Sequence, residues 1–422
     1  MAEIAQAGLI ITSEPDNADV VVINTCAFIA PARAESIEMI THALRCKKRH
    51  KVKKIIVAGC LAQKMGEKLF SELDGIDAVI GLDKRDSIVR VIEETLSGKN
   101  CLACVGAPLS QASDIIPDDR TRFRITPCHW AYLRISEGCS HKCSFCTIPS
   151  IRGPFRSKPL SIVLAEAKEL VAAGAVELNL IAQDTAYYGR DSKNMPRLTT
   201  LLTELVKLDG LAWIRLMYLY PARIDQALIA TVAASGKIVS YFDIPIQHVN
   251  SRILKAMRRG ETADRIRPLM DNLRAAIPDV TLRTTLIIGF PGETDDEFAE
   301  LLEFVKSANF DALGCFAFSP EPGTTAANMP DQVPEHIKNQ RLEEIMLAQQ
   351  QIAFAKNAQR IGDNLTCLVD SVDNSTVKGR YYGQAPEIDG FCIIKNSSAK
   401  PGQFVHTAVI ARKDYDLIVE QI

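Results

Sequence analysis

The stretch Cys139-Ser-His-Lys-Cys143-Ser-Phe-Cys146 decides the fold class of this chain. It closely follows the apolar run at 131–136, which predicts a buried β-strand. Thiolates are soft ligands that select iron–sulfur clusters or zinc. A structural zinc site needs a fourth ligand, and His141 is poorly spaced to supply it. The spacing therefore favours a four-iron cluster that leaves one iron open, rather than a zinc knuckle.

An open iron predicts a particular chemistry. A low-potential cluster of this kind can bind S-adenosylmethionine and pass it an electron. Cleavage of the sulfonium C–S bond then gives a 5′-deoxyadenosyl radical, which removes a hydrogen atom from a substrate. We therefore predict that Cys139, Cys143 and Cys146 hold a [4Fe–4S] cluster and form the catalytic centre, with S-adenosylmethionine as a cofactor.

Strand and helix patterns alternate around this loop, from about residue 123 to residue 356. Such alternation predicts a parallel sheet, here a full or partial barrel of six strands. In these barrels the active site lies at the carboxyl ends of the strands, and the cysteine loop follows one such end. The predicted strands are 131–136, 176–182, 213–218, 239–244, 281–288 and 312–318.

Two further domains flank the predicted barrel. Residues 1–107 contain strand patterns at 19–23 and 54–58, each followed by a loop and a helix pattern, and predict a small open α/β sheet. Residues 108–127 are polar and aperiodic, as in a linker. Residues 357–422 hold short β-rich runs between turn residues, and predict a small antiparallel β-barrel of the OB-like kind.

The composition is that of an ordinary globular protein, with 422 residues, 47% hydrophobic, 24% charged and a net charge of −2. This length allows two or three domains, and the charge is not that of a dedicated nucleic-acid coat. We expect neither a signal peptide nor a membrane span, and hence a cytoplasmic protein. In a reducing cytosol, twelve cysteines are better explained by metal binding or catalysis than by disulfides.

With these motifs the chain resembles the radical S-adenosylmethionine superfamily, and within it the methylthiotransferases. The resemblance covers nearly the whole sequence. It implies an N-terminal domain at 1–107, a radical barrel at 123–356 and a C-terminal TRAM domain at 357–422. It also implies two [4Fe–4S] clusters, an electron donor and two S-adenosylmethionine molecules per turnover, one methylating sulfur at the second cluster and the other yielding the radical.

Cys26 and Cys60 each stand directly after a predicted strand. Parallel strands end at one edge of a sheet, so these thiols either converge or are simply buried. The resemblance implies that they ligate the second, auxiliary cluster. The family's third auxiliary cysteine, at the end of a first strand, has no counterpart here, and we expect that the start of the chain is missing. The alternatives are that Cys46, Cys101 or Cys104 replaces it, or that this cluster is lost.

Two substrate classes fit a methylthiotransferase: an aspartate of ribosomal protein S12, or an adenosine in transfer RNA. The runs Asp243-Ile-Pro-Ile-Gln-His248 and Ala385-Pro-Glu-Ile-Asp-Gly390 resemble the protein-modifying branch. Residues 357–422 hold seven Lys and Arg against eight Asp and Glu, whereas an RNA-binding barrel needs excess positive charge. We therefore predict methylthiolation at the β-carbon of an aspartate in S12, with the small ribosomal subunit as a further candidate partner. The basic run 45–54 keeps the transfer-RNA hypothesis open.

Three polar residues are candidate contacts of S-adenosylmethionine. Gln183, Gln247 and Arg283 lie at or near predicted strand ends, where side chains can reach a bound cofactor by hydrogen bonds. Polar residues at such positions often only cap helices, and this alternative stays open. Glycines in the run 289–294 allow backbone to approach a ligand, and Thr294 is a predicted N-cap of the helix that follows.

Overall fold

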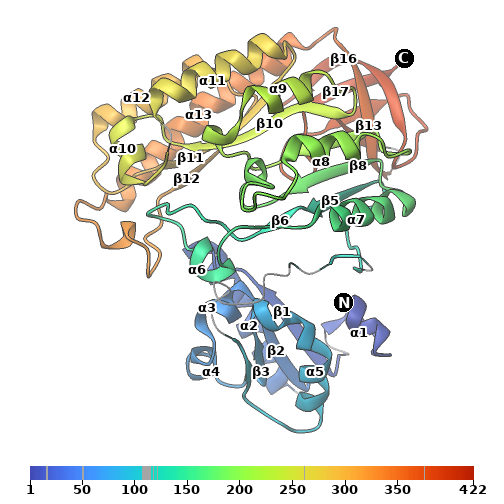
Figure 1. Cartoon of the computed structure of the whole chain (residues 1–422), viewed down its shortest axis with the longest axis vertical. Coiled ribbons are helices and arrows are strands. Elements are labelled where there is room, and N and C mark those ends of the chain that lie inside the picture. The colour runs from blue at the N-terminus through green and yellow to red at the C-terminus, as the bar shows by residue number, and fades with distance from the viewer. Residues whose placement is uncertain are drawn as a thin grey trace. The chain divides into compact units, whose positions relative to one another are not determined.

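Figure 1 shows a computed structural model of the chain. The structure describes residues 1–15, 18–49, 52–106, 116, 118–120, 122–260, 262–374 and 376–422. It divides into two compact units, the first comprising Met1–Phe123, Glu137–Arg156 and Ser319–Ala327, and the second Arg124–Ser136, Ser157–Phe318 and Asn328–Ile422. Much of the linker expected at 108–127 lies outside the described residues.

The first unit is built on a four-stranded parallel sheet in the order β1-β2-β3-β4. β1 (Val20–Thr25) and β2 (Lys54–Gly59) confirm the two strand patterns of this region. β3 (Ala78–Ile80) and β4 (Leu102–Cys104) are too short to show a period in the sequence. The helices are α1 (Ala2–Gln6), α2 (Ala30–Lys48), α3 (Cys60–Met65), α4 (Lys68–Glu72), α5 (Ile88–Leu96) and α6 (Ile148–Arg152).

The second unit contains a six-stranded parallel sheet in the order β12-β11-β10-β9-β8-β5. It is open between β12 and β5, which makes it a partial barrel, and it confirms all six predicted strands. The strands are β5 (Trp130–Arg134), β8 (Glu177–Ile181), β9 (Trp213–Leu216), β10 (Ile238–Gln247), β11 (Thr281–Ile288) and β12 (Ala312–Ala317). A small separate sheet pairs β6 (Ser136–Glu137) with β7 (Arg156–Ser157).

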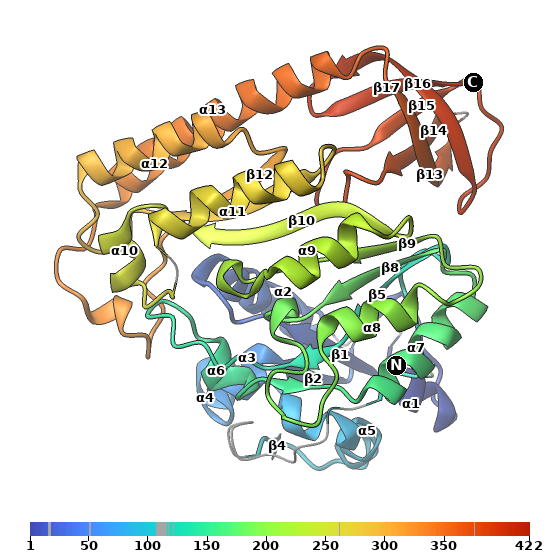
Figure 2. The same ribbon diagram turned by 45° about the horizontal axis from the view of Figure 1, so that its top comes forward.

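Helices cover the outer side of this sheet, as Figures 1 and 2 show. They are α7 (Leu160–Ala172), α8 (Leu198–Leu205), α9 (Gln226–Ala233), α10 (Ser251–Ala256), α11 (Ala263–Ala276), α12 (Asp295–Ala308) and α13 (Glu335–Gln359). Leu178, Ile214 and Leu282 are completely buried in the same hydrophobic core, because alternate strand residues point outward to these helices. The residues between them, such as Asn179, Arg215 and Arg283, are polar.

The C-terminal residues form a closed five-stranded barrel in the order β13-β14-β15-β17-β16. This confirms the predicted OB-like barrel, with one correction to its description as antiparallel. β15 and β17 pair in parallel, because the chain passes through β16 before it returns as β17 beside β15. The other neighbouring strands are antiparallel. The strands are β13 (Asn364–Asp373), β14 (Thr376–Tyr381), β15 (Cys392–Lys395), β16 (Phe404–Lys413) and β17 (Asp416–Gln421).

A buried ionic network joins this small barrel to the parallel sheet. Glu177, at the start of β8, contacts Arg215 Nε at 3.0 Å and Arg380 Nη2 at 2.8 Å. Arg380 also bonds Asp370 Oδ2 at 2.7 Å, and His129 Nε2 lies 2.9 Å from Asp370 Oδ1. Because Glu177 and Arg215 are wholly inaccessible to solvent, each charge depends on its partners for compensation.

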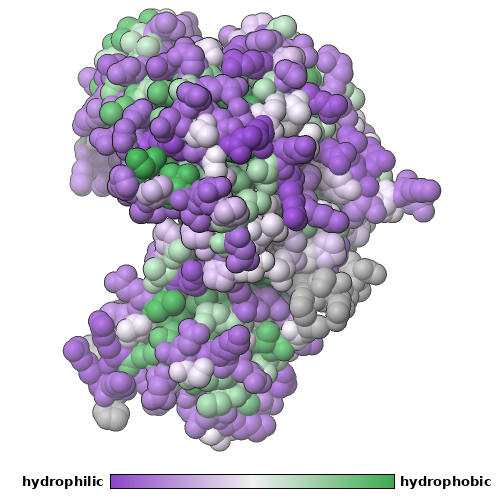
Figure 3. Space-filling view, turned by 90° about the vertical axis from the view of Figure 1, so that its left-hand side faces the viewer, coloured by the Kyte–Doolittle hydropathy of each residue, from purple (hydrophilic) through white to green (hydrophobic). Residues whose placement is uncertain are grey.

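Figure 3 shows one face of the molecule, on which hydrophilic residues are widespread. Within the described part of the chain, none of the helices combines the length and the apolar character that crossing a membrane would require.

Replacing Arg380 tests the network. We expect Arg380→Gln to lower the free energy of unfolding of the second unit by about 3 kcal/mol, because it leaves buried carboxylates undercompensated. Both tryptophans, Trp130 and Trp213, belong to this unit, so urea unfolding followed by tryptophan fluorescence reports on it. Lys395→Gln, at an exposed residue of β15, is the matched control and should cost less than about 0.5 kcal/mol. Equal unfolding midpoints for the two variants would contradict the expectation.

Candidate active site

The predicted cluster loop is held by backbone contacts at Gly138 and Cys139. Cys139 is 8% exposed, and its N–H donates to Gly153 O at 3.0 Å. Gly138, just before it, has φ +79°, and a Cβ there would lie 2.2 Å from Pro154 O. Only glycine fits this close crossing of two backbones. The turn therefore fixes where the first thiol of the loop stands.

The other two thiols of the loop are half-buried. Cys146 N–H donates to Cys143 O at 3.2 Å, which closes a tight turn between these residues. The N–H of Ile148, the first residue of α6, lies 3.4 Å from Cys146 Sγ. Backbone N–H groups that face a ligand sulfur stabilise its thiolate form. All three predicted ligands thus lie in one short, partly accessible loop.

Cys26 and Cys60 stand side by side at the carboxyl edge of the first sheet. The preceding residues, Thr25 and Gly59, are register partners in the parallel pair β1–β2. Cys26 is anchored by Ser36 of α2, whose hydroxyl accepts from Cys26 N and donates to Cys26 O, both at 3.0 Å. Cys60 opens α3. Sequence reasoning left open whether these thiols converge, and the register of the sheet brings them together.

The electrostatics of Cys60 differ from those of an isolated thiol. Burial raises the pKa of Cys60, the Arg152 guanidinium opposes this effect, and the neighbouring Cys26 adds to it. Arg152 is the last residue of α6, and its Nη2 lies 3.6 Å from Cys60 Sγ. Its Nη1 donates to Glu137 Oε1 at 2.7 Å. One guanidinium therefore connects Cys60 with the residue that precedes the Gly138 turn.

A second group of charges lies on the helices that follow Cys26 and Cys60. Arg33 of α2 and Lys64 of α3 contact Glu321 Oε2 at 2.6 Å and 3.5 Å. Glu321 is 1% exposed, and although burial raises its pKa, the bonds from Arg33 and Ser319 outweigh burial and lower it. Two cations thus share one carboxylate in this unit. The sequence did not predict that Arg33, Lys64 and Arg152 belong to the same unit as the cysteines, because these cations are far apart in the chain.

Among the residues that the structure describes, no group of three or more His, Cys, Asp or Glu is arranged to hold a single metal ion. All twelve cysteines lie within those ranges, and none forms a disulfide. A four-iron cluster makes a different demand from a single ion, because each thiolate binds its own iron and the sulfurs stay apart. A loop of three partly accessible thiols fits such a cluster better than it fits zinc.

Two of the three candidate S-adenosylmethionine contacts lie at carboxyl ends of strands. Gln247 is the last residue of β10, is 4% exposed and has φ +69°, a strained conformation for a non-glycine residue. Gln183 follows the end of β8, and its Oε1 is buried with no hydrogen-bond partner among the described residues. Both positions agree with the edge at which ligands bind in parallel sheets.

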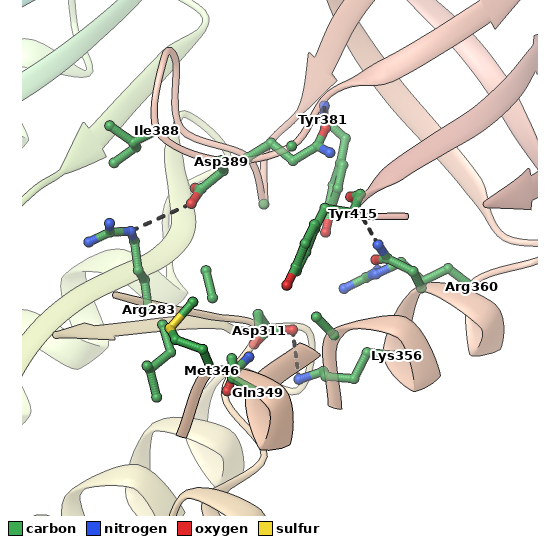
Figure 4. Close-up of a pocket in the computed structure, with 17 residues that line it drawn as sticks. Arg283, Asp311, Met346, Gln349, Lys356, Arg360, Tyr381, Ile388, Asp389 and Tyr415 are labelled. Carbon is green, nitrogen blue, oxygen red and sulfur yellow. Dashed lines mark hydrogen bonds and ion pairs between the residues drawn. The ribbon is translucent and has the colours of Figure 1, made fainter. Parts of the chain in front are cut away.

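Arg283 has a different environment. It is the third residue of β11, near the amino end of that strand, and its Nη1 donates to Asp243 Oδ1 at 3.0 Å. Its Nε lies 3.5 Å from Asp389 in the C-terminal barrel, and both residues line a cavity of about 360 Å³ (Figure 4). Figure 4 also shows the pair formed by Lys356 and Asp311 at this cavity. The position of Arg283 therefore favours a part in joining the two barrels over contact with S-adenosylmethionine.

The turn at 289–294 is organised by Glu293. Both carboxylate oxygens of Glu293 accept from Gly289 N at 3.0 Å, and Arg341 Nη1 lies 2.7 Å from Oε1. Thr294 caps α12 in a capping box with Glu297, which confirms the predicted N-cap. The turn is thus a rigid strand-to-helix connection at the carboxyl end of β11.

Comparisons with known proteins first define a class. Residues 133–305 match the Radical SAM superfamily, residues 361–422 the TRAM domain, and residues 1–81 an uncharacterized protein family, UPF0004. A solved structure with a similar fold is the radical S-adenosylmethionine methyltransferase TsrM from Kitasatospora setae, with a TM-score of 0.55 and 15% identity over 74% of this chain and 66% of that one. The chain therefore has a radical S-adenosylmethionine fold followed by a TRAM domain.

The relatives narrow the class. Ribosomal protein uS12 methylthiotransferase RimO of Geobacter sulfurreducens is 45% identical over 98% of this chain and 92% of its own length. The protein of the same name from Syntrophomonas wolfei is 42% identical over 100% of this chain and 95% of its own length. The chain belongs to the family of ribosomal protein uS12 methylthiotransferases.

The Gly138 turn can be tested separately from the cysteines. We expect Gly138→Ala to displace the loop, because its Cβ would clash with Pro154 O, and to lower the iron bound after anaerobic reconstitution from about eight per chain toward the about four of the auxiliary site. Gly174→Ala is the matched control, since Gly174 also has a positive φ, +97°, but its Cβ would meet nothing closer than 3.7 Å. Full iron loading of Gly138→Ala, measured by iron assay and visible absorption, would show that the close approach of the backbone at Gly138 to Pro154 is not needed for cluster binding.

Proposed function

We infer that this chain is a radical S-adenosylmethionine methylthiotransferase that replaces a hydrogen on the β-carbon of an aspartate in ribosomal protein S12 with a methylthio group. The observation that carries this inference is the 45% identity to a uS12 methylthiotransferase along 98% of the chain. The cysteine loop after β5 supplies ligands of the right kind.

Cys139, Cys143 and Cys146 are the residues that we propose hold the radical cluster. When bound there with S-adenosylmethionine, a four-iron cluster supplies the electron that splits the sulfonium and so generates a hydrogen-abstracting radical. The β-carbon of aspartate is unactivated, and no side-chain base removes its hydrogen as a proton. Gln183 and Gln247, at carboxyl ends of strands, remain proposed contacts of S-adenosylmethionine.

Cys26 and Cys60 are the proposed ligands of an auxiliary cluster at which sulfur is methylated before transfer. Their adjacent positions, and the Arg152 guanidinium 3.6 Å from Cys60 Sγ, suit an anionic group. Cys104 is a poor substitute for a third ligand, because β3 stands between β4 and β2 and separates it from Cys60 by roughly two strand spacings, or about 10 Å. Cys46 packs on the hydrophobic core of this unit, and Cys101 is exposed before β4.

The protein substrate is favoured over transfer RNA by two observations. The relatives named above are uS12 methylthiotransferases. In addition, lysines of the basic run 45–54 are paired within the protein: Lys47 and Lys54 both bond Asp77, and Lys53 bonds Asp19 at 2.6 Å. Such pairs leave less charge to neutralise phosphates.

We further propose a division of labour among three segments. Residues 1–107 would hold the sulfur to be transferred, 123–356 would generate the radical, and 357–422 would dock S12, on the free protein or on the small ribosomal subunit. The reaction also needs an electron donor, and for a ribosomal substrate we propose a cytoplasmic location.

The function is tested by the mass of S12. In a strain lacking the gene, S12 should lose the mass of one methylthio substituent, and the wild-type gene should restore it, whereas variants with Cys139, Cys143 or Cys146 replaced by alanine should not. The profile of transfer-RNA nucleosides is recorded in parallel. Unchanged S12 beside the loss of a methylthio-nucleoside would reverse the substrate assignment.

Iron content tests the number of clusters. After anaerobic reconstitution we expect about eight iron and eight sulfide per chain for two clusters. Changing Cys139, Cys143 and Cys146 to alanine together should leave about four of each, bound at the auxiliary site. About four in the wild-type chain and none in the triple variant would mean that this chain holds only the radical cluster.

A further inference from the structure

The guanidinium of Arg152 occupies a position that the proposed function does not yet use. Its two terminal nitrogens face different groups: Nη2 faces Cys60 Sγ at 3.6 Å and Nη1 faces Glu137 Oε1 at 2.7 Å. Glu137 is 7% exposed and directly precedes Gly138 and Cys139. Arg152 itself comes six residues after Cys146, at the end of α6. One side chain from the radical loop therefore reaches a thiol of the other cysteine pair.

We propose that Arg152 is a positioning residue that donates a hydrogen bond to the Cys60 thiolate and raises the reduction potential of the auxiliary cluster. This proposal rests on the proposed function, in that it assumes a cluster on Cys26 and Cys60. A cluster with thiolate ligands is anionic, and one-electron reduction adds a further negative charge. A fixed cation beside a ligand sulfur stabilises the reduced form more than the oxidised form.

The surroundings of Arg152 make this effect substantial. The side chain of Arg152 is 27% exposed and the side chain of Glu137 only 9%, so water screens the interaction less than at an open surface. The Glu137 carboxylate fixes the guanidinium plane, as residues behind a metal ligand commonly do. Because that carboxylate accepts at Nη1, the Nη2 hydrogens are left for the sulfur. The Arg152–Glu137 pair also couples the cysteine pair to the Gly138 turn, so the cluster ligated by Cys60 and the loop of Cys139 share one support.

Arg152 differs from the other cations of this unit. Arg33 and Lys64 both bond the buried Glu321 carboxylate, and neither has a contact to a sulfur among the described residues. They raise the local positive charge, whereas Arg152 adds a directed hydrogen bond. Comparing Arg152 with Lys64 therefore separates the hydrogen bond from the general effect of charge.

The test uses the full chain with Cys139, Cys143 and Cys146 changed to alanine, so that only the auxiliary cluster contributes. Anaerobically reconstituted protein is titrated with reductant, and the reduced cluster is followed by electron paramagnetic resonance. We expect Arg152→Met to shift the midpoint potential to a more negative value with unchanged iron content. Arg152→Lys, which keeps the charge but not the forked geometry, should recover part of the shift.

Two matched controls complete the design. Lys64→Met removes a nearby cation without touching a sulfur and should shift the potential less than Arg152→Met, and Lys68→Met, at an exposed residue of α4, should not shift it. An equal potential in Arg152→Met and the parent, an equal shift in Lys64→Met, or the absence of a cluster in the triple-alanine chain would each overturn the proposal. S12 modification is measured separately with the chain that keeps Cys139, Cys143 and Cys146. If that chain does not modify S12, the result contradicts the proposed substrate and not the role of Arg152.

Discussion

Parallel pairing of strands is the constraint on which the Cys26–Cys60 pair and the candidate S-adenosylmethionine contacts depend. When neighbouring strands run in one direction, their carboxyl ends meet at one edge, and the residues that follow are brought together without any need for proximity in sequence. In the first unit this places Cys26 beside Cys60, which are separated by an entire strand–helix unit in the chain. In the second unit it places Gln183 and Gln247 at the same edge of a six-stranded sheet.

The opposite edge of that sheet serves a structural purpose. Glu177, Arg215 and Arg283 lie near the amino ends of their strands, and each contacts a residue of the C-terminal barrel. A buried charge costs several kcal/mol unless it is compensated. The network therefore stabilises the docking of the small barrel, because separating the two barrels would leave buried ions without their partners.

Charge is organised differently around the cysteines. Three cations, Arg33, Lys64 and Arg152, face two carboxylates, Glu137 and Glu321, in the same unit as all five proposed ligand cysteines. Of these cations, Arg152 lies next to a thiol; its guanidinium opposes the rise that burial causes in the pKa of Cys60 and suits an anionic cluster there. The arginine that belongs to the radical loop also touches the other cysteine pair, so the two sites share electrostatics as well as a fold.

Much of this protein follows from local sequence. The cysteine spacing determined the class of chemistry, and strand and helix periods determined all six strands of the partial barrel, because both signals are carried by residues close together in the chain. Thr294 as a helix cap is likewise local. The tertiary structure decided what depends on residues distant in sequence: the three-residue strands β3 and β4, the parallel pair β15–β17, the place of Arg283 near the C-terminal barrel, and the reach of Arg152 to Cys60. Such contacts arise from packing and charge compensation, which no local pattern encodes.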